Sequence, residues 1–393
     1  MADMPELTLF AAVPAARVAD GRLLLDDKFV SGMRLHAAQW DGPVRAVMRD
    51  LGSGSLPFAS PVDPGALGFQ VTLVAPDAPL TQALGQAPGV ILISADMVDQ
   101  LDLVAAAHAR GLKVVCGIEY TLETRLRIAG LERGRSLPKK LWSMLWNLRA
   151  EHGRRAALRQ ADGIQMNGFP AEAAYAKLNR KPLRYLDNRM SAEMFALAPE
   201  MEARRLRHAE GQPLRLINSG RLEPMKGAHL LVPLALALRE RQVPFTLDIY
   251  GAGSLEDEIR RGIAEAGLAQ VSLHAPVPFE TELVPISRSR ADIFVSCHVQ
   301  SDPSCTYIEA MGCGLPVAGF ANHMLRALVQ DSGAGWCAPM GDVAALAGQI
   351  AALAGDRAGL IAKAEAGLDY ARRHDFHAEF AARMRHLAQV VSP

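Results

Sequence analysis

Two cations stand close together in the stretch SGRLEPMKG, residues 219–227. Arg221 and Lys226 lie five residues apart, and each is next to a glycine, Gly220 or Gly227. An apolar run precedes the stretch and another follows it, so it predicts the tight connection between a buried strand and a buried helix. A guanidinium and an ammonium at such a place both suit phosphate oxygens. The alternative is two solvated loop cations, and both interpretations fit these residues.

A second pair of glycines lies in YGAGSLEDEIR. Gly251 and Gly253 follow an apolar run and precede an acidic helix start. Closely spaced glycines let a backbone approach a phosphate or a sugar. The stretch is not a complete GxGxxG dinucleotide fingerprint, because Glu256 stands at the third glycine position. A tight turn from strand to helix explains the two glycines equally well.

A third stretch, SDPSCTYIEAMGCGLPV, predicts a helix with Asp302 as its N-cap and Pro303 at its first position. Free backbone N–H groups at a helix start make an anion site. The residues that would supply them are Ser304, Cys305 and Thr306. Glu309 lies two turns in, about 10 Å along the helix axis. One helix would then contact a phosphate at its tip and a sugar hydroxyl through Glu309.

Apolar runs that alternate with helical patterns position these motifs. The expected strands are 7–13, 44–48, 71–74, 90–94 and 114–118 in the first half, and 214–217, 245–250, 271–274, 293–296 and 316–319 in the second. The expected helices include 101–110, 230–239, 255–266 and 378–390. Strand, helix, glycine and strand in succession are typical of βαβ units and parallel sheets.

This order predicts an α/β protein with two doubly wound domains in tandem. The expected domains are residues 1–200 and 205–370, and residues 371–393 would form a C-terminal helix that packs back on the first domain. The polar segment 197–215 is interpreted as the connection between the two. Ligands of such sheets bind at the carboxyl ends of the strands. A ligand cleft between the domains is therefore expected.

Composition limits the possible classes. The chain has 393 residues with 42 basic and 42 acidic side chains, which argues against a protein that coats nucleic acid. The five cysteines form no CxxC pair, and their odd number excludes a complete disulfide framework. The N-terminus lacks the pattern of a signal peptide, and no run reaches the roughly 20 apolar residues of a membrane span. A cytoplasmic protein is expected.

The three motifs together resemble the donor half of retaining GT-B glycosyltransferases, specifically the large family 4 group that uses nucleotide sugars. GRLEPMKG is similar to the family's GRL…KG loop, GAGSLEDEIR to its second glycine turn and IEAMGCGLPV to its EAMACGxPV signature. The resemblance covers roughly residues 205–370, and over the first 200 residues it is one of pattern only. It implies the GT-B fold, in which two Rossmann-like domains face a cleft, with the acceptor on the N-terminal domain.

The resemblance also implies roles for the matching residues. Arg221 and Lys226 would hold the donor diphosphate and neutralise its developing charge, and Glu309 would accept hydrogen bonds from the nucleotide ribose. The other positions expected at the donor are Gly220, Gly227, Gly251, Gly253, Val277, Pro278, Ser301, Ser304, Cys305, Thr306 and Gly32. Among these, Val277 and Pro278 lie where the family places the base. Gly32, before the helical run MRLHAAQ, would match an N-terminal glycine, although the usual double glycine is absent.

The chain departs from the family near the donor sugar. The family motif has two glutamates eight residues apart, and Ser301 stands at the place of the first. Asp302 is adjacent, but an N-cap carboxylate is occupied by its helix. His323-Met324 replaces the usual Gly-Gly after the last donor strand. These changes predict either an unusual donor sugar or a degenerate site.

Glu119 follows the fifth apolar run, where relatives often carry a histidine near the acceptor. It would orient or deprotonate the acceptor hydroxyl. The alternative is a carboxylate paired with Arg125 or Arg127. His298 is interpreted as a satisfied histidine at the end of a strand.

A basic segment lies at 122–159, with ten Lys and Arg and three Glu side chains, a net charge of +7. Four leucines at helical spacing and two tryptophans follow its second part, 137–159: Leu137, Leu141, Leu145, Leu148, Trp142 and Trp146. Basic residues and Trp on an amphipathic helix suit an anionic membrane surface. In the alternative, the apolar stripe packs on the domain and the charges are solvated.

The sequence therefore predicts a metal-independent, retaining glycosyltransferase. It would move a sugar from a nucleotide diphosphate sugar to a hydroxyl acceptor in bacterial surface polysaccharide or glycolipid assembly, without a cofactor. Its expected partners are the nucleotide sugar, a hydroxyl acceptor that is lipid-linked in many relatives, and the inner face of the membrane, but no nucleic acid. Two other functions stay open. They are a non-catalytic nucleotide-sugar binding protein, motivated by Ser301, and a Rossmann-type oxidoreductase, which would need a complete glycine fingerprint.

Overall fold

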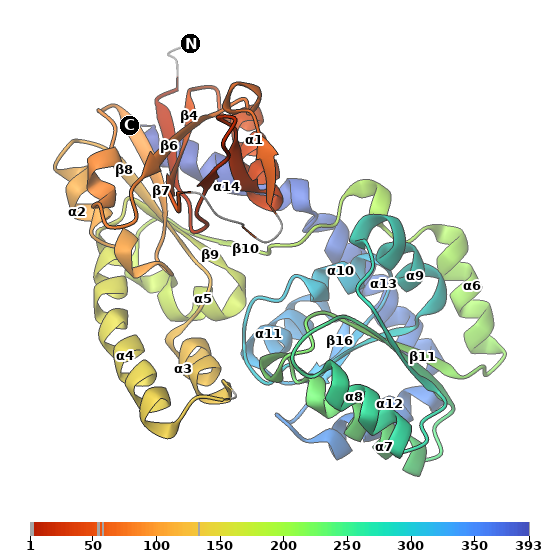
Figure 1. The fold of residues 1–393 in the computed structure, drawn as a ribbon. Coiled ribbons are helices and arrows are strands. Elements are labelled where there is room, and N and C mark those ends of the chain that lie inside the picture. Colours follow the sequence, from red (N-terminus) through yellow and green to blue (C-terminus); the bar gives the residue numbers. More distant parts are fainter. Residues whose placement is uncertain (1–3, 53–55, 57–58, 133, 393) are drawn as a thin grey trace.

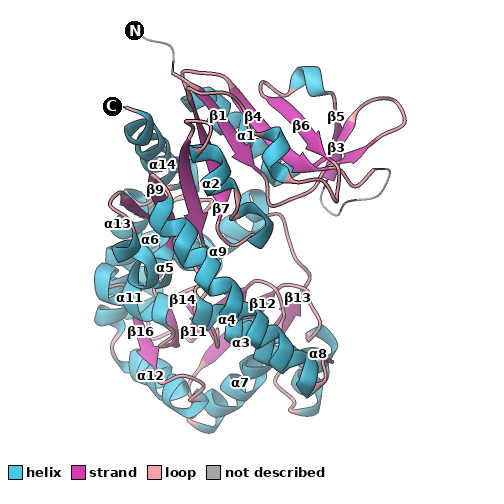
Figure 2. Ribbon diagram, turned by 90° about the vertical axis from the view of Figure 1, so that its left-hand side faces the viewer, coloured by secondary structure: helices cyan, strands magenta, loops and turns pink. Residues whose placement is uncertain are grey.

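The computed structural model describes residues 4–52, 56, 59–132 and 134–392. These residues form two α/β domains that lie side by side, with both ends of the chain at the N-terminal domain (Figure 1). Figure 2 shows the same two domains from the side, with helices covering the strands of each sheet.

The N-terminal domain contains a seven-stranded parallel sheet in the order β10-β9-β8-β7-β1-β4-β6. Its strands are β1 (Glu6–Phe10), β4 (Val44–Arg49), β6 (Gln70–Val74), β7 (Gly89–Ser94), β8 (Lys113–Ile118), β9 (Gly163–Asn167) and β10 (Pro182–Tyr185). Its helices are α1 (Asp27–Gln39), α2 (Leu103–His108), α3 (Leu122–Leu131), α4 (Leu137–Gln160) and α5 (Gly168–Tyr175). From β1 the chain adds β4 and β6 on one side of the sheet and then β7 to β10 on the other, so the topological switch point of the domain lies between β1 and β7.

A small antiparallel sheet is attached to this domain. It consists of β2 (Ala16–Arg17), β3 (Leu23–Asp26) and β5 (Ala59–Val62). The sequence pattern did not predict it, because its strands are two to four residues long. Its strand β3 leads directly into α1 and so fixes where that helix begins.

The C-terminal domain contains a six-stranded parallel sheet in the order β13-β12-β11-β14-β15-β16. Its strands are β11 (Leu214–Ser219), β12 (Phe245–Tyr250), β13 (Val271–His274), β14 (Ile293–Ser296), β15 (Val317–Phe320) and β16 (Gly335–Ala338). Its helices are α6 (Ala198–Ala209), α7 (Leu231–Glu240), α8 (Glu256–Glu265), α9 (Val284–Arg290), α10 (Thr306–Gly312), α11 (His323–Ser332), α12 (Val343–Gly355) and α13 (Arg357–Arg373). Every residue of β14 and β15 is buried, as expected for central strands covered on both faces.

The polar segment 197–215, interpreted as the connection between the two domains, is largely helix α6 of the C-terminal domain. Within α6, Arg204 is 0% exposed and donates to the backbone carbonyls of Arg288 and Gly314 at 2.9 and 2.8 Å. A helix whose buried face carries arginine resembles a solvated segment in a hydropathy pattern, which explains the wrong prediction. Residues 186–197, between β10 and α6, form the passage from the first sheet to the second domain.

The last helix, α14 (Phe376–Val391), lies against the N-terminal sheet (Figure 1). Its apolar side chains share one buried cluster with strands β1, β4 and β7: Phe380, Met384, Leu387 and Val390. The chain therefore crosses between the domains twice, and residues from its far end contribute to the N-terminal domain.

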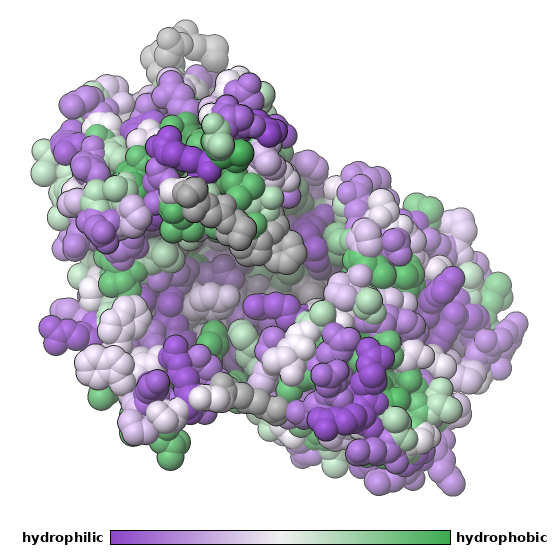
Figure 3. All heavy atoms as spheres, in the orientation of Figure 1, coloured by the Kyte–Doolittle hydropathy of each residue, from purple (hydrophilic) through white to green (hydrophobic). Residues whose placement is uncertain are grey.

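The two domains touch beside a cleft. The Arg127 guanidinium of α3 donates to the backbone carbonyl of Val299 at 3.2 Å, and His323 Nδ1 of α11 lies 3.2 Å from a Glu123 oxygen of α3. Figure 3 shows the surface hollowed between the two domains. Strands of both sheets end towards this region, which places the loops that carry the motifs on either side of it.

Candidate functional site

The loop that holds Arg221 and Lys226 follows β11 directly. Arg221 is exposed, and Lys226 ends a short 3-10 turn, Pro224–Lys226. Gly227 follows with a φ of 66°, and a Cβ on it would lie 1.7 Å from the carbonyl oxygen of Cys297. Only glycine fits there, because the backbone is left-handed and touches a second loop. That contact brings Lys226 next to the loop that follows β14.

Lys226 is paired with Asp302 in the structure. Its ammonium contacts the Asp302 carboxylate, and the two side chains are 14% and 7% exposed. Burial on its own would raise the pKa of the Asp302 carboxyl, but the neighbouring Lys226 charge holds that pKa below its usual range. The other carboxylate oxygen lies 3.7 Å from His298 Nδ1. Lys226 is therefore not a solvated loop cation.

The helix after this loop begins later than predicted. Helix α10 starts at Thr306 with Cys305 as its N-cap, so neither Asp302 nor Pro303 opens it. The Asp302 carboxylate is bound to Lys226 and does not cap a backbone N–H. Ser304 and Thr306 lie side by side, with their hydroxyl oxygens 2.8 Å apart.

Ser301 is 3% exposed, and its hydroxyl accepts a hydrogen bond from the backbone N–H of His323 at 3.0 Å. The bond fixes the start of α11, where Asn322 is the N-cap. His298 is also buried, and its Nδ1 lies 3.2 Å from the Tyr307 hydroxyl. This agrees with its interpretation as a satisfied histidine.

Glu309 lies on α10 and is 5% exposed. Arg189, from the passage between the domains, binds it with two hydrogen bonds, Nε to Oε1 at 2.7 Å and Nη2 to Oε2 at 2.9 Å. The guanidinium also stacks over Phe279, with 3.7 Å from Cζ to the ring centroid. Val277 and Pro278 immediately precede Phe279, so the positions expected for the base and the ribose are adjacent in space.

The glycines after β12 support the loop of Arg221. A Cβ on Gly251 would lie 2.0 Å from the Gly220 carbonyl oxygen, and one on Gly253 would lie 2.6 Å from that of Leu222. Beside Gly220 itself the space is open. The two glycines of the second turn therefore allow two loops to pack, which agrees with the tight-turn alternative.

Arg221 is electrostatically coupled to the N-terminal domain. Burial raises the pKa of the Tyr120 hydroxyl, and nearby Glu119 and Asp302 raise it further, whereas the Arg221 charge opposes the shift. Tyr120 follows β8 and Arg221 follows β11, so the carboxyl ends of the two sheets face one another here.

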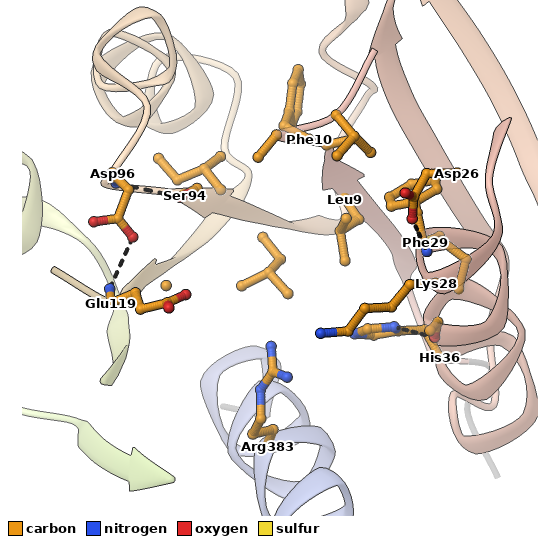
Figure 4. Close-up of a pocket in the computed structure, with 18 of the residues that line it drawn as sticks. Leu9, Phe10, Asp26, Lys28, Phe29, His36, Ser94, Asp96, Glu119 and Arg383 are labelled. Atoms are coloured by element: carbon orange, nitrogen blue, oxygen red, sulfur yellow. Dashed lines mark hydrogen bonds between the residues drawn. The ribbon is translucent and has the colours of Figure 1, made fainter. Parts of the chain in front are cut away.

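Glu119 lines a pocket of the N-terminal domain at the carboxyl ends of β1, β7 and β8 (Figure 4). Burial, followed by the charges of Asp96, Asp187 and Asp302, raises its pKa to about 7. The alternative pairing is wrong, because Arg125 binds Asp96 and Arg127 binds Glu123. Glu119 is thus a carboxyl poised to exchange a proton near neutral pH.

Gly32 lines the same pocket. Gly32 was expected to precede a helix, but it lies inside α1, which begins five residues earlier after the N-cap Asp26. A Cβ on Gly32 would meet no atom within 4 Å. The expected contact with the donor remains a prediction.

Four further residues take part in these sites in ways that the sequence did not predict. Asp302 binds Lys226, Arg189 covers Glu309, and Lys28 and Arg383 line the Glu119 pocket. Arg383 carried a usable signal. It lies three residues after Phe380 and four before Leu387, on the apolar face of α14. An arginine at such a position indicates a specific partner or a functional site.

Helix α4 exposes its apolar side chains. Their exposed fractions are 75% for Leu137, 61% for Leu141, 71% for Trp142, 61% for Leu145, 48% for Trp146 and 48% for Leu148. The alternative in which this stripe packs on the domain is therefore wrong. None of the described helices is both long enough and apolar enough to cross a bilayer.

Residues 201–373 match the model of the family described as glycosyl transferases group 1. A stretch of 166 residues is 29% identical to the amylovoran biosynthesis glycosyltransferase AmsK of Erwinia amylovora, over 40% of each chain. A 166-residue stretch is also 28% identical to the putative colanic acid biosynthesis glycosyltransferase WcaL of Escherichia coli K12, over 41% of this chain and 39% of that protein. The chain thus spans about two fifths of the length of these relatives. The resemblance seen in the motifs is confirmed over the matched residues.

Solved structures resemble the whole chain. HepE of Anabaena in complex with UDP has a TM-score of 0.63 at 15% identity and is covered over 99% of both chains. Sucrose-phosphate synthase of Thermosynechococcus elongatus has a TM-score of 0.65 at 17% identity over 98% of both chains. Likeness at this level of identity concerns the fold alone, and it confirms the predicted GT-B fold with two Rossmann-like domains.

Proposed function

We propose that this chain, whose residues 201–373 match the glycosyl transferases group 1 family, is a retaining, metal-independent glycosyltransferase. It moves a sugar from a nucleotide diphosphate sugar to a hydroxyl acceptor and uses no cofactor. The observation that carries the proposal is the pair of cations after β11. Arg221 is exposed, and Lys226 is held by Asp302 in a loop that contacts α3 of the N-terminal domain. The relatives named for amylovoran and colanic acid biosynthesis support a role in surface polysaccharide assembly.

In this proposal the C-terminal domain binds the donor. Arg221 and Lys226 bind the diphosphate, and Asp302 keeps the Lys226 ammonium in place before the donor arrives. The backbone around Ser304 and Thr306 completes the phosphate site, and the ribose competes with Arg189 for Glu309. The base lies beside Val277 and Pro278.

The N-terminal domain supplies the acceptor hydroxyl to Glu119. The acceptor oxygen forms a bond to the anomeric carbon on the same face from which the diphosphate leaves, so the configuration of that carbon is retained. The electron pair of the broken bond stays on the diphosphate, next to Arg221 and Lys226, and the hydroxyl proton passes to Glu119. Removing one such charge-stabilising donor typically costs about 3–4 kcal/mol of transition-state stabilisation. A pKa near 7 suits a general base at neutral pH.

The experiment measures nucleoside diphosphate release from a panel of UDP-, GDP- and ADP-sugars, with an extract of bacterial envelope glycolipids as acceptor. We expect turnover by the wild type with one donor class and a loss of about a hundredfold or more in Arg221→Ala and in Lys226→Ala. The control is Arg260→Ala on α8, which removes an exposed cation that pairs with Glu256. Equal turnover in all four proteins contradicts the proposal.

The exposed face of α4 supports a further part of the proposal, attachment to an anionic membrane surface. Trp142 and Trp146 lie beside Arg135 and Lys139 around one surface groove. Indole rings at the headgroup level and cations beside anionic lipids are both favourable. The site of action is then the inner face of the membrane, close to lipid-linked acceptors.

Co-sedimentation with vesicles tests this attachment. We expect the wild type to pellet with phosphatidylglycerol vesicles but not with phosphatidylcholine vesicles, because the basic side chains are attracted to anionic headgroups. Pelleting should fall as salt rises, since salt screens exposed charges. Trp142→Ala/Trp146→Ala should stay in solution. The matched control is Leu197→Ala/Leu206→Ala, which removes side chains that are 54% and 57% exposed near α6. Pelleting that is equal in both double variants rules the attachment out.

A further inference from the structure

The Glu119 pocket lies at the topological switch point of the N-terminal sheet. It has a volume of about 380 Å³, within the range of small-molecule sites, and opens at the carboxyl ends of β1 and β7. In doubly wound sheets this is the crevice where ligands bind. The pocket is lined by the N-terminal domain and α14, and none of the C-terminal residues assigned to the donor lines it, although Gly32, an expected donor contact, does.

Two cations point into this pocket (Figure 4). Lys28, in the first turn of α1, has no ion-pair or hydrogen-bond partner within the described part of the chain. Arg383 of α14 is anchored by its Nε, which donates to Gln165 Oε1 at 3.0 Å, and it stacks over Tyr185 at 4.4 Å from the ring centroid. Its terminal nitrogens face the cavity, where Lys28 also ends.

The other charged groups around the pocket already have partners. Asp26 accepts from the backbone N–H of Phe29 at 2.8 Å, and Asp96 binds Arg125 and the backbone N–H of Glu119. Burial, followed by the Arg383 charge, lowers the pKa of His36 to about 4, so its ring is neutral at pH 7. Glu119 stands across the cavity from Lys28 and Arg383 (Figure 4). One end of the pocket is therefore cationic, and the other ends in a carboxyl.

We infer that the acceptor carries an anionic group, which Lys28 and Arg383 bind while the reacting hydroxyl faces Glu119. This rests on the proposed transferase function and narrows its acceptor to a sugar with a carboxylate or a phosphate. Arg383 presents a planar fork and Lys28 a mobile ammonium, and both bind either oxyanion. A neutral sugar would leave two cations at the pocket without a partner.

NMR titration of the whole protein with three sugar probes tests the inference: methyl glucuronide, glucose 6-phosphate and the neutral methyl glucoside. The wild type should bind at least one anionic probe about tenfold or more tightly than methyl glucoside, because hydrogen bonds to a charged group are stronger than neutral ones. Lys28→Ala should lose that preference. Arg34→Ala, an exposed cation further along α1 and outside the pocket, should retain it.

The outcomes distinguish a carboxylate from a phosphate, and they distinguish failure of the anionic acceptor from failure of the proposed transferase function. A preference for the glucuronide identifies a carboxylate, and a preference for glucose 6-phosphate identifies a phosphate. Equal binding of neutral and anionic probes, no binding of either anion, or a preference that survives in Lys28→Ala overturns the inference. Thermal shifts with UDP, GDP and ADP on the same samples report the donor site independently. Nucleotide binding without anion binding would leave the proposed function standing.

Discussion

Removing the Lys226 side chain should destabilise the C-terminal domain through the carboxylate that it leaves behind. Asp302 is 6% exposed, and one of its oxygens has no hydrogen-bond partner among the described residues. In Lys226→Ala burial still opposes a charge on His298, because burial is the largest cause of its lowered pKa. In Lys226→Ala the carboxylate is therefore buried without a cation.

The size of the effect follows from the burial of the pair. Removing one partner of a buried ion pair costs about 3–5 kcal/mol, whereas replacing both is often close to neutral. For a domain of this size that corresponds to a fall of roughly 6–20 °C in the unfolding temperature. Lys226→Met/Asp302→Asn should recover most of the loss. Arg221→Ala, which removes an exposed cation, should change stability by no more than about 0.5 kcal/mol.

The pH dependence gives the effect a signature. In the wild type the lowered pKa of Asp302 contributes stability above the ordinary value of 3.8 and loses it only as the pH falls through the lowered pKa. In Lys226→Ala the Lys226 charge no longer opposes burial, the largest cause, so that pKa rises and the variant loses stability as the pH rises above about 4. Chemical denaturation should therefore show a gap between the two proteins that is largest at pH 7 and shrinks towards pH 4. A gap that is independent of pH refutes the reasoning.

Two further predictions concern buried carboxyls. The pKa of Glu119 is raised from 4.5 to about 7, so its contribution to the stability of the protein is complete below pH 4.5 and is lost as the pH rises to about 7. In urea titrations at pH 8, Glu119→Gln should therefore be more stable than the wild type by about 2–3 kcal/mol. Glu119→Gln should also remove the rise of kcat/KM through pH 7, and a rise that persists excludes Glu119 as the base. Arg189→Ala should destabilise the free protein by roughly 2–3 kcal/mol, because it leaves the Glu309 carboxylate unpaired. UDP should raise the unfolding temperature of this variant by more than that of the wild type, since the ribose hydroxyls donate hydrogen bonds to the Glu309 oxygens that Arg189 no longer binds. A smaller UDP shift in Arg189→Ala argues against ribose binding at Glu309.

The sequence predicted the two sheets because most of their strands are short apolar runs, buried on both faces. Within the two parallel sheets the sequence missed β9 (GIQMN), β10 (PLRY) and β16 (GWCA). β9 lies inside the sheet but contains the polar residues Gln165 and Asn167, whereas β10 and β16 lie at sheet edges. Edge strands need less apolar surface, so their pattern is weak.

The motifs located the donor loops, but side-chain partners depend on residues far apart in the chain. Asp302 has the pattern of a helix N-cap, yet it binds Lys226, which lies 76 residues away. Arg125 was a local candidate to pair with Glu119, but it binds Asp96 instead. Arg383 reaches the N-terminal pocket only because α14 returns to the first sheet. Such long-range choices are set by packing, which a single sequence does not display.

The measurement that tests the central claim most directly is isothermal titration of the wild type and Arg221→Ala with UDP, GDP, ADP and the matching nucleosides. Arg221 is suited to this comparison because it is exposed and its removal leaves no buried charge behind. The wild type should bind one diphosphate at least about tenfold more tightly than its nucleoside, and Arg221→Ala should lose most of that difference. If none of the diphosphates binds, or if Arg221→Ala keeps the full difference, the cations after β11 do not hold a donor diphosphate.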